Sequence, residues 1–319
     1  MSSIPLTQIT HGDLSIKSIT TSKDKIEQPE LAKDEKMFIP PLGSSIIISG
    51  KSGSGKTTLL NNLLTDGRFY GKSKERPNGW FDKIFLFSPT ANGDDVQRSL
   101  NIPKKYVFTD LDEAPQLLEI VLDSQQKKID KAKGAEEVQQ FAVIFDDVIG
   151  NTKFMNSKAF TRCFYQVRHV NCTTFICTQH FKRVPKICRL QANFIFFFQG
   201  SQSEVETIAE EFAPPRVSKK TFMKFVDEVT NDKFAFLTVN MKTGVQYRFR
   251  KNLDTFADFT NVRDDHEQKF VSHKEKEDVL DNGVSEQAPP IEKRAQLKRK
   301  RVEGGFGDDI RHTEGRRGT

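Results

Sequence analysis

The chain has 319 residues, of which 29% are charged and 36% are hydrophobic, and its formal net charge is +6. This length accommodates one large α/β domain with appended segments. No apolar run approaches the roughly 20 residues that span a bilayer, which argues against a membrane-spanning protein.

The cysteines and the first residues bear on the compartment. The four cysteines form no Cys-x-x-Cys pair, which favours a reducing compartment and unpaired thiols. A zinc site built from them with His169 and His180 would fit no standard zinc spacing. The first residues lack the charged and apolar regions of a signal peptide, so we expect an intracellular protein.

Residues 1–36 are polar and lack sustained periodicity, so we expect an N-terminal arm with one short strand over 14–19. A domain over 37–260 follows. Within it, strand-like runs cover 45–49, 83–87, 142–145, 173–178 and 194–198, and helix-like segments separate them. This alternation predicts an α/β fold, with a parallel sheet whose crossovers are helices.

A complete phosphate-binding loop follows the first of these strands and opens into an apolar helix. Its glycines let successive backbone N–H groups point inward at phosphate oxygens. Lys56 is expected to reach the β- and γ-phosphates, and the Thr57 hydroxyl to ligate Mg²⁺. The sequence therefore predicts that ATP and Mg²⁺ bind here, at Gly50, Lys51, Ser52, Gly53, Ser54, Gly55, Lys56, Thr57 and Thr58.

The segment 112–133 predicts a long amphipathic helix with no chemistry of its own. The apolar strand after it ends in Asp146 and Asp147, which is the Walker B pattern. Asp146 is expected to hold the Mg²⁺ ion, and Asp147 stands where many ATPases place the base that orients the attacking water.

Three further side chains are candidates for the site. The strand over 173–178 ends in Gln179, where a polar group can contact the γ-phosphate or the attacking water. Arg168 ends a predicted helix over 157–167, and Arg189 precedes the strand over 194–198. Either arginine can stabilise phosphoryl charge as a finger supplied in trans, although for either residue alone a structural salt bridge or a helix-end charge is the favoured explanation.

The last third of the chain predicts a helix over 218–229 and a C-terminal β-hairpin with strands at 233–239 and 245–250. Residues 261–319 form a charged tail with equal numbers of basic and acidic residues, 13 of each, so the net positive charge lies within 1–260. We expect the tail to be disordered. Its basic cluster over 293–301 resembles a nuclear-localisation or phosphate-contacting segment.

Taken together, the order of these motifs resembles the poxvirus-type DNA-packaging ATPases of the FtsK-HerA superfamily, which occur in large DNA viruses, virophages and Polinton-like elements. The resemblance covers residues 38–250 and rests on the phosphate loop, Asp146-Asp147, the pair Arg168-His169, Gln179 and the segment 184–189. Many members carry Asp-Glu where this chain has Asp146-Asp147, so the shorter side chain leaves the base role of Asp147 open.

The resemblance implies a RecA-like (ASCE) P-loop NTPase fold, with the strand over 173–178 between the phosphate-loop and Walker B strands. It implies a homo-oligomeric ring that hydrolyses ATP and drives double-stranded DNA into a capsid, with capsid portal proteins as partners and the host cytoplasm or nucleus as compartment. On the family pattern the trans-acting finger is Arg189, with Arg168 as runner-up.

Other functions stay open at this point. A helicase or DNA-pumping ATPase of the same superfamily would serve replication or DNA transfer instead of packaging. A small-molecule kinase would need an acceptor pocket and an arginine-rich lid, which the sequence does not indicate. A nucleotide-binding scaffold without hydrolysis fits poorly with Asp146, Asp147 and Gln179 together.

Overall fold

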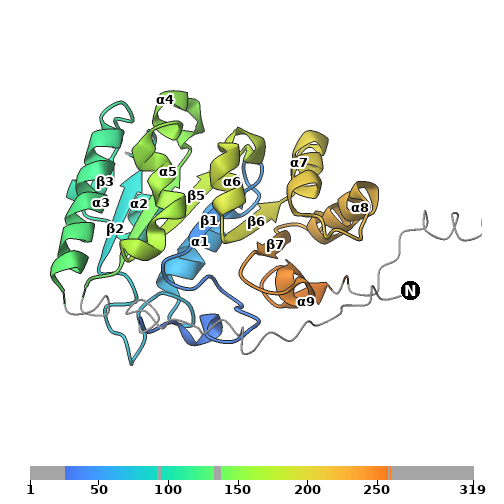
Figure 1. The fold of residues 1–319 in the computed structure, drawn as a ribbon, viewed down its shortest axis with the longest axis horizontal. Helices are drawn as coiled ribbons and strands as arrows, with labels where there is room; N and C mark the ends of the chain where they lie inside the picture. The colour runs from blue at the N-terminus through green and yellow to red at the C-terminus, as the bar shows by residue number, and fades with distance from the viewer. Residues whose placement is uncertain (1–25, 92–94, 133–137, 258, 260–319) are drawn as a thin grey trace, which may run out of the picture. The chain divides into compact units, whose positions relative to one another are not determined.

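A sheet of nine strands forms the centre of the described chain (Figure 1). The computed structural model describes residues 26–91, 95–132, 138–257 and 259. The strands are β1 (Ser45–Ser49), β2 (Lys83–Phe87), β3 (Val107–Phe108), β4 (Phe141–Asp146), β5 (Cys172–Thr178), β6 (Phe194–Phe198), β7 (Phe236–Asn240), β8 (Phe249–Lys251) and β9 (Thr255–Ala257).

The strands lie in the order β3-β2-β4-β5-β1-β6-β7-β8-β9. Every pair from β3 to β6 is parallel, and the pairs from β6 to β9 are antiparallel. Strand β5 therefore separates the phosphate-loop strand β1 from the Walker B strand β4, as the RecA-like arrangement requires. The predicted α/β P-loop fold is confirmed.

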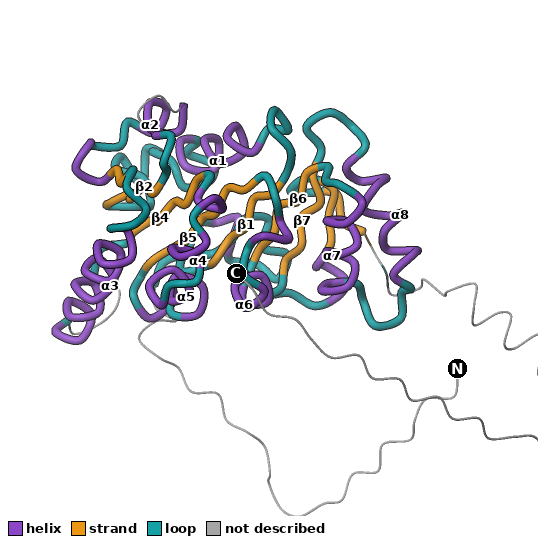
Figure 2. The backbone as a smooth tube through the Cα atoms, turned by 90° about the horizontal axis from the view of Figure 1, so that it is seen from above, coloured by secondary structure: helices purple, strands orange, loops and turns teal. Residues whose placement is uncertain are grey.

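Helices cover both faces of the sheet because successive strand residues point to opposite faces. Ile46 and Ile48 of β1 pack in the same cluster as Leu60 of α1, whereas Ile47 packs with Phe160 of α5. Figure 2 shows α1 and α2 on one face and α3, α5, α6 and α7 on the other. The helices are α1 (Lys56–Thr65), α2 (Asp95–Leu100), α3 (Ala114–Lys131), α4 (Thr152–Met155), α5 (Lys158–Tyr165), α6 (Lys186–Gln191), α7 (Gln202–Phe212), α8 (Lys219–Thr230) and α9 (Val245–Arg248).

Several helices begin at a serine that serves as the N-cap residue. The Ser157 hydroxyl accepts a hydrogen bond from the Phe160 N–H at the start of α5, and Ser218 does the same at the start of α8. Ser201 and Glu204 form a reciprocal capping box at α7. The three helices expected over 112–133, 157–167 and 218–229 are thus confirmed as α3, α5 and α8, within a few residues.

The C-terminal hairpin predicted from the sequence is present, but the predicted position of its second strand is wrong. Strand β7 does pair antiparallel with a later strand, but residues 245–248 form the short helix α9, and the pairing strand β8 starts at Phe249. The alternation of Val245, Tyr247 and Phe249 with polar residues is typical of a strand. The Asn240 side chain accepts the Lys242 N–H and turns the chain early, and the Tyr247 ring packs on Phe256 from the helix.

Residues 26–36, the described part of the predicted arm, pack against the domain. The Gln28 side chain accepts the Leu42 N–H at 2.6 Å, and Ala32 is buried. The fully buried Arg250 donates to the carbonyl oxygens of Lys36 and Met37 and so ties this segment to β8. The strand expected over 14–19 and the tail over 261–319, with its basic cluster, lie outside the described residues.

A helix that spans a bilayer must be both long and apolar. Within 26–91, 95–132, 138–257 and 259, none is both long enough and apolar enough to span a membrane.

Candidate nucleotide-binding site

The predicted phosphate loop connects the end of β1 to the start of α1. Two of its glycines have left-handed backbones, with φ of 73° at Gly53 and 105° at Gly55. A Cβ at Gly50 would lie 2.5 Å from the Phe198 Cβ, so that position has no room for a side chain. At Gly53 nothing lies within 4 Å of such an atom, so the left-handed backbone rather than crowding favours glycine there. The loop geometry fits a phosphate cradle.

Lys56 and Thr57 occupy the first turn of α1, where the helix dipole favours negative charge. The Lys56 ammonium donates to the carbonyl oxygens of Gly50 at 2.8 Å and Lys51 at 2.9 Å. These bonds hold the charge against the loop that it is expected to serve. Lys56 and Thr57 are half-buried, and Thr58 is exposed.

The Walker B acids lie at the same edge of the sheet as the phosphate loop. Asp146 is in register with Cys177 of β5, and Cys177 is in register with Ile48 of β1. Because parallel strands end at one edge, the carboxylate and the loop share that edge. The backbone of Asp147 is left-handed, with φ of 51°, and its N–H donates to the Cys177 carbonyl at 3.3 Å.

Gln179 contacts the second Walker B acid. Its side-chain amide donates to both carboxylate oxygens of Asp147, at 3.3 and 3.4 Å. The sequence pointed to each residue separately, but it carried no signal for this contact. The pair joins the ends of β4 and β5, so the amide limits the directions in which the carboxylate can point.

The donor set fits a magnesium ion. Mg²⁺ takes oxygen ligands and is usually held by one or two carboxylates together with substrate phosphates. The Thr57 hydroxyl and the Asp146 carboxylate supply such oxygens, one from each side of β5. In the described part of the chain no group of three or more His, Cys, Asp or Glu side chains is arranged to hold a metal ion by itself.

The cysteines are packing residues. All four cysteines are reduced and buried, and burial raises the pKa of Cys172 and of Cys188 to about 12. The Cys172 and Cys188 thiols therefore stay protonated near neutral pH. His180 lies beside Glu204, with its Nδ1 3.7 Å from a carboxylate oxygen.

Arg189, the favoured trans finger, makes its contacts inside its own subunit. Its guanidinium pairs with Glu211 through two bonds, at 2.9 and 2.5 Å, and the two side chains are only 8% and 9% exposed. It also donates to the carbonyl oxygens of Lys182 and Val184. These contacts join α6 to α7, and Arg189 can reach a neighbouring subunit only if they break.

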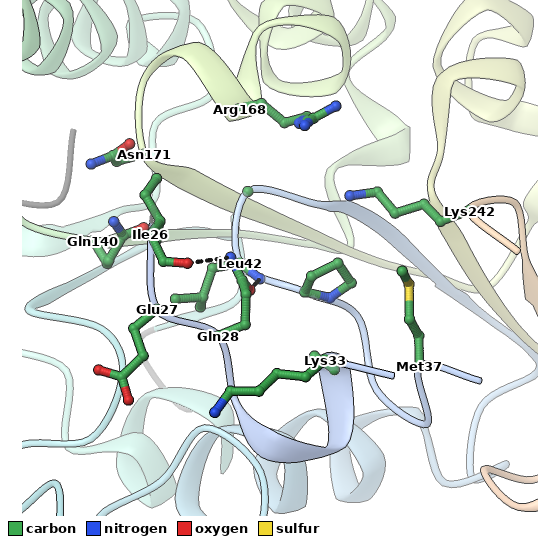
Figure 3. Close-up of a pocket in the computed structure, with 13 residues that line it drawn as sticks. Ile26, Glu27, Gln28, Lys33, Met37, Leu42, Gln140, Arg168, Asn171 and Lys242 are labelled. Atoms are coloured by element: carbon green, nitrogen blue, oxygen red, sulfur yellow. Dashed lines mark hydrogen bonds between the residues drawn. The ribbon is translucent and has the colours of Figure 1, made fainter. Parts of the chain in front are cut away.

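Arg168, the runner-up, lies at the opposite edge of the sheet from the phosphate loop. It lines a cavity of about 440 Å³ with Gly43, just before β1, and Lys242, just after β7. Figure 3 shows the Arg168 and Lys242 side chains extending from opposite sides of the view. Burial, and then the nearby Arg168, lower the pKa of Lys242 from its ordinary 10.5 to about 8.

Phe198 is a site residue that the sequence suggested only as part of a buried strand. It ends β6, is 2% exposed, and its side chain occupies the space beside Gly50 and Gly55. It therefore forms the wall behind the phosphate loop. The signal was its place at the carboxyl end of a strand, but only the pairing of β6 with β1 makes that position adjacent.

Two viral proteins resemble part of this chain. Protein 088R of Invertebrate iridescent virus 3 is 26% identical over 210 residues, which cover 65% of this chain and 73% of that protein. Protein 015R of Frog virus 3 is 23% identical over 163 residues, which cover 49% and 44%. Both are described as uncharacterized.

Some solved structures are similar to this chain at low identity. The DNA-packaging ATPase B204 of Sulfolobus turreted icosahedral virus covers 66% of this chain and 97% of its own, at 13% identity and a TM-score of 0.45. The EccC ATPase of Thermomonospora curvata covers 67% of this chain and 37% of its own, at 12% identity and a TM-score of 0.41.

A protein-family profile also matches this chain. The profile described as "Poxvirus A32 protein" matches residues 42–241, which include the phosphate loop, both Walker B acids and Gln179. This match spans more than half of the 319 residues. The chain belongs to the poxvirus A32 protein family.

Proposed function

We propose that this chain is the ATP-hydrolysing subunit of a motor that translocates double-stranded viral DNA into a capsid. The observation that carries the proposal is the phosphate loop and the Asp147–Gln179 pair at one edge of the sheet, in a member of the poxvirus A32 family. A loop that only bound nucleotide would not need a carboxylate held in place by a second polar group.

Each polar residue has one task in this proposal. The loop N–H groups and Lys56 hold the triphosphate and neutralise charge on its β- and γ-phosphates. Asp147 orients the attacking water and accepts its proton, and Gln179 fixes the Asp147 carboxylate through the bonds at 3.3 and 3.4 Å. Thr57 and Asp146 would hold Mg²⁺, which supplies charge stabilisation at the phosphoryl group when bound.

The proposed motor is a homo-oligomeric ring around duplex DNA, with capsid portal proteins as partners. The excess of positive charge within residues 1–260 supports contact with phosphates. Such contacts suit packaging because they carry no sequence information. Arg189 stays the proposed trans finger, with Arg168 as the runner-up. Arg189 can act in trans only when its ion pair with Glu211 is broken.

The test is steady-state ATP turnover by the full chain, with and without long duplex DNA of mixed sequence. We expect duplex to stimulate turnover regardless of sequence and Lys56→Ala to abolish it, because the charge at the β- and γ-phosphates is lost. Lys74→Ala, an exposed lysine outside the site, is the matched control and should behave like the wild type. Turnover that ignores duplex but rises with a small-molecule phosphate acceptor would instead identify a kinase.

A further inference from the structure

Phe234 lies beside the phosphate loop on the side away from the catalytic acids. Strand β7 runs antiparallel to β6, so the residues just before it lie at the edge where β1 ends in the loop. The Phe234 ring comes within 3.4 Å of the position that a Cβ on Gly55 would take. The ring therefore borders the loop where α1 begins.

The backbone at Phe234 is one that phenylalanine rarely adopts. The Ala235 N–H donates to the Asp232 carbonyl at 3.0 Å and closes a four-residue turn, and Phe234 is its third residue with φ of 67°. Glycine or asparagine normally fills such a position because a bulky side chain is strained there. Strained residues of this kind cluster at ligand-binding sites.

The ring is also unusually exposed for this protein. Among the residues whose side chains the structure describes, Phe234 is the only phenylalanine that is exposed, at 56%. The Lys233 ammonium lies 4.9 Å from the ring centre. A strained turn that presents an apolar ring to solvent destabilises the free protein, so packing within the subunit does not explain it.

The positions of the other site residues orient the nucleotide. Asp146, Asp147 and Gln179 come from β4 and β5, which lie on one side of β1, and the γ-phosphate must face them. The opposite end of a bound nucleotide then points toward β6 and β7. Phe234 is the exposed flat surface at that end.

We infer that Phe234 forms the subsite for the nucleobase of the nucleotide whose phosphates the loop holds, by stacking its ring on the base. The inference rests on the proposed nucleotide-binding function. Stacking contacts the face of a base and reads none of its edges, so the subsite should accept any purine. Its contribution should be absent for a ligand that consists of phosphates alone.

The sharpest variant is Phe234→Asn, because asparagine suits the left-handed turn but removes the ring. By calorimetric titration of the full chain with Mg²⁺, we expect it to weaken ATP binding roughly 5- to 30-fold. It should leave inorganic tripolyphosphate binding unchanged and should keep or raise the melting temperature. Phe234→Tyr should bind ATP like the wild type. Tyr165→Ala removes another ring, 47% exposed on α5, and is the matched control.

Two results would overturn this assignment. Equal ATP affinities in the wild type and Phe234→Asn would exclude a base contact. An equal loss of ATP and tripolyphosphate binding would mean that the ring only shapes the loop or contacts a neighbouring subunit. Failure of the nucleotide-binding proposal gives a different pattern, since the wild type itself would then bind neither ligand.

Discussion

At the scale of single residues, the contact between Gln179 and Asp147 is the most informative feature of the candidate site. Asp147 takes the place of the glutamate that many relatives of the superfamily carry, and its side chain is one methylene shorter. In the proposed mechanism, the Gln179 amide, 3.3 Å from the carboxylate, compensates by fixing where the shorter acid points. Asp147 as proposed base and Gln179 as its positioning group should therefore be treated as one unit.

The first prediction separates the roles of these two residues. Asp147→Asn should retain ATP and Mg²⁺, because Asp146 remains, but should lower the hydrolysis rate about 10²- to 10⁴-fold. Gln179→Glu should shift the acidic limb of the rate–pH profile upward, since two adjacent carboxylates raise the pKa of one of them. Near-normal turnover in Asp147→Asn would place the base elsewhere.

The second prediction concerns Lys242, whose cavity also contains Glu27, Lys33 and Arg168. Its pKa is lowered from 10.5 to about 8, so between these values the unfolded chain binds a proton that the folded chain does not. The contribution of Lys242 to the free energy of unfolding therefore rises with pH across that window. The full cost of burying its charged ammonium applies below pH 8. Lys242→Met should raise unfolding stability by about 1–3 kcal/mol at pH 7.

Urea unfolding of wild type and Lys242→Met at pH 7 and pH 10 measures this difference. The gain should shrink above pH 8 and be nearly gone by pH 10.5. A gain that is the same at every pH would mean that the methionine packs better and that titration of the lysine is irrelevant.

What the sequence predicted at this scale depended on whether a residue carries a local motif. Lys56, Thr57 and Asp146 stand in fixed motifs, and the structure places them at one edge of the sheet. The burial of Arg189 against Glu211 could not be predicted, because its partner lies 22 residues away on another helix. Phe234 gave no signal either, since nothing local shows that its backbone is left-handed.

At the scale of elements, the buried strands were the easiest to predict. Strands β1, β2 and β6 start and end at the expected residues, because continuous apolar runs are typical of parallel strands with both faces covered. The sequence pattern does not indicate the short strand β9, and it predicts a strand where α9 forms. There the contact of Tyr247 with Phe256, distant in sequence from the turn, overrides the alternating pattern.

The third prediction concerns how Arg189 connects α6 and α7. Arg189→Ala leaves the buried Glu211 carboxylate without its partner, which should cost about 3–5 kcal/mol of unfolding stability. If the arginine also acts in trans, mixing this variant with Lys56→Ala should restore part of the lost ATPase activity. Stable, assembled mixtures without any rescue would leave Arg189 with a structural role and favour Arg168.

At the scale of the whole molecule, the two edges of the sheet, where the parallel strands end and where they begin, carry different groups of residues. The carboxyl edge carries the phosphate loop, the Asp147–Gln179 pair and Phe234, while the amino edge carries the basic cavity of Arg168 and Lys242. ATP chemistry at one edge is therefore separated by the strand length from the cations at the other. The sequence predicted this polarity through the parallel sheet but not the cavity, which residues distant in the chain assemble.

The central claim is that hydrolysis moves the protein along intact duplex DNA. The most direct measurement is displacement of a labelled third strand from a blunt-ended duplex by the full chain with ATP and Mg²⁺. We predict ATP-dependent displacement that Lys56→Ala abolishes, that is independent of duplex sequence and that weakens steeply with salt. The duplex itself should remain paired. Separation of the strands of a forked duplex, with no displacement from the blunt one, would contradict the packaging motor and identify a helicase.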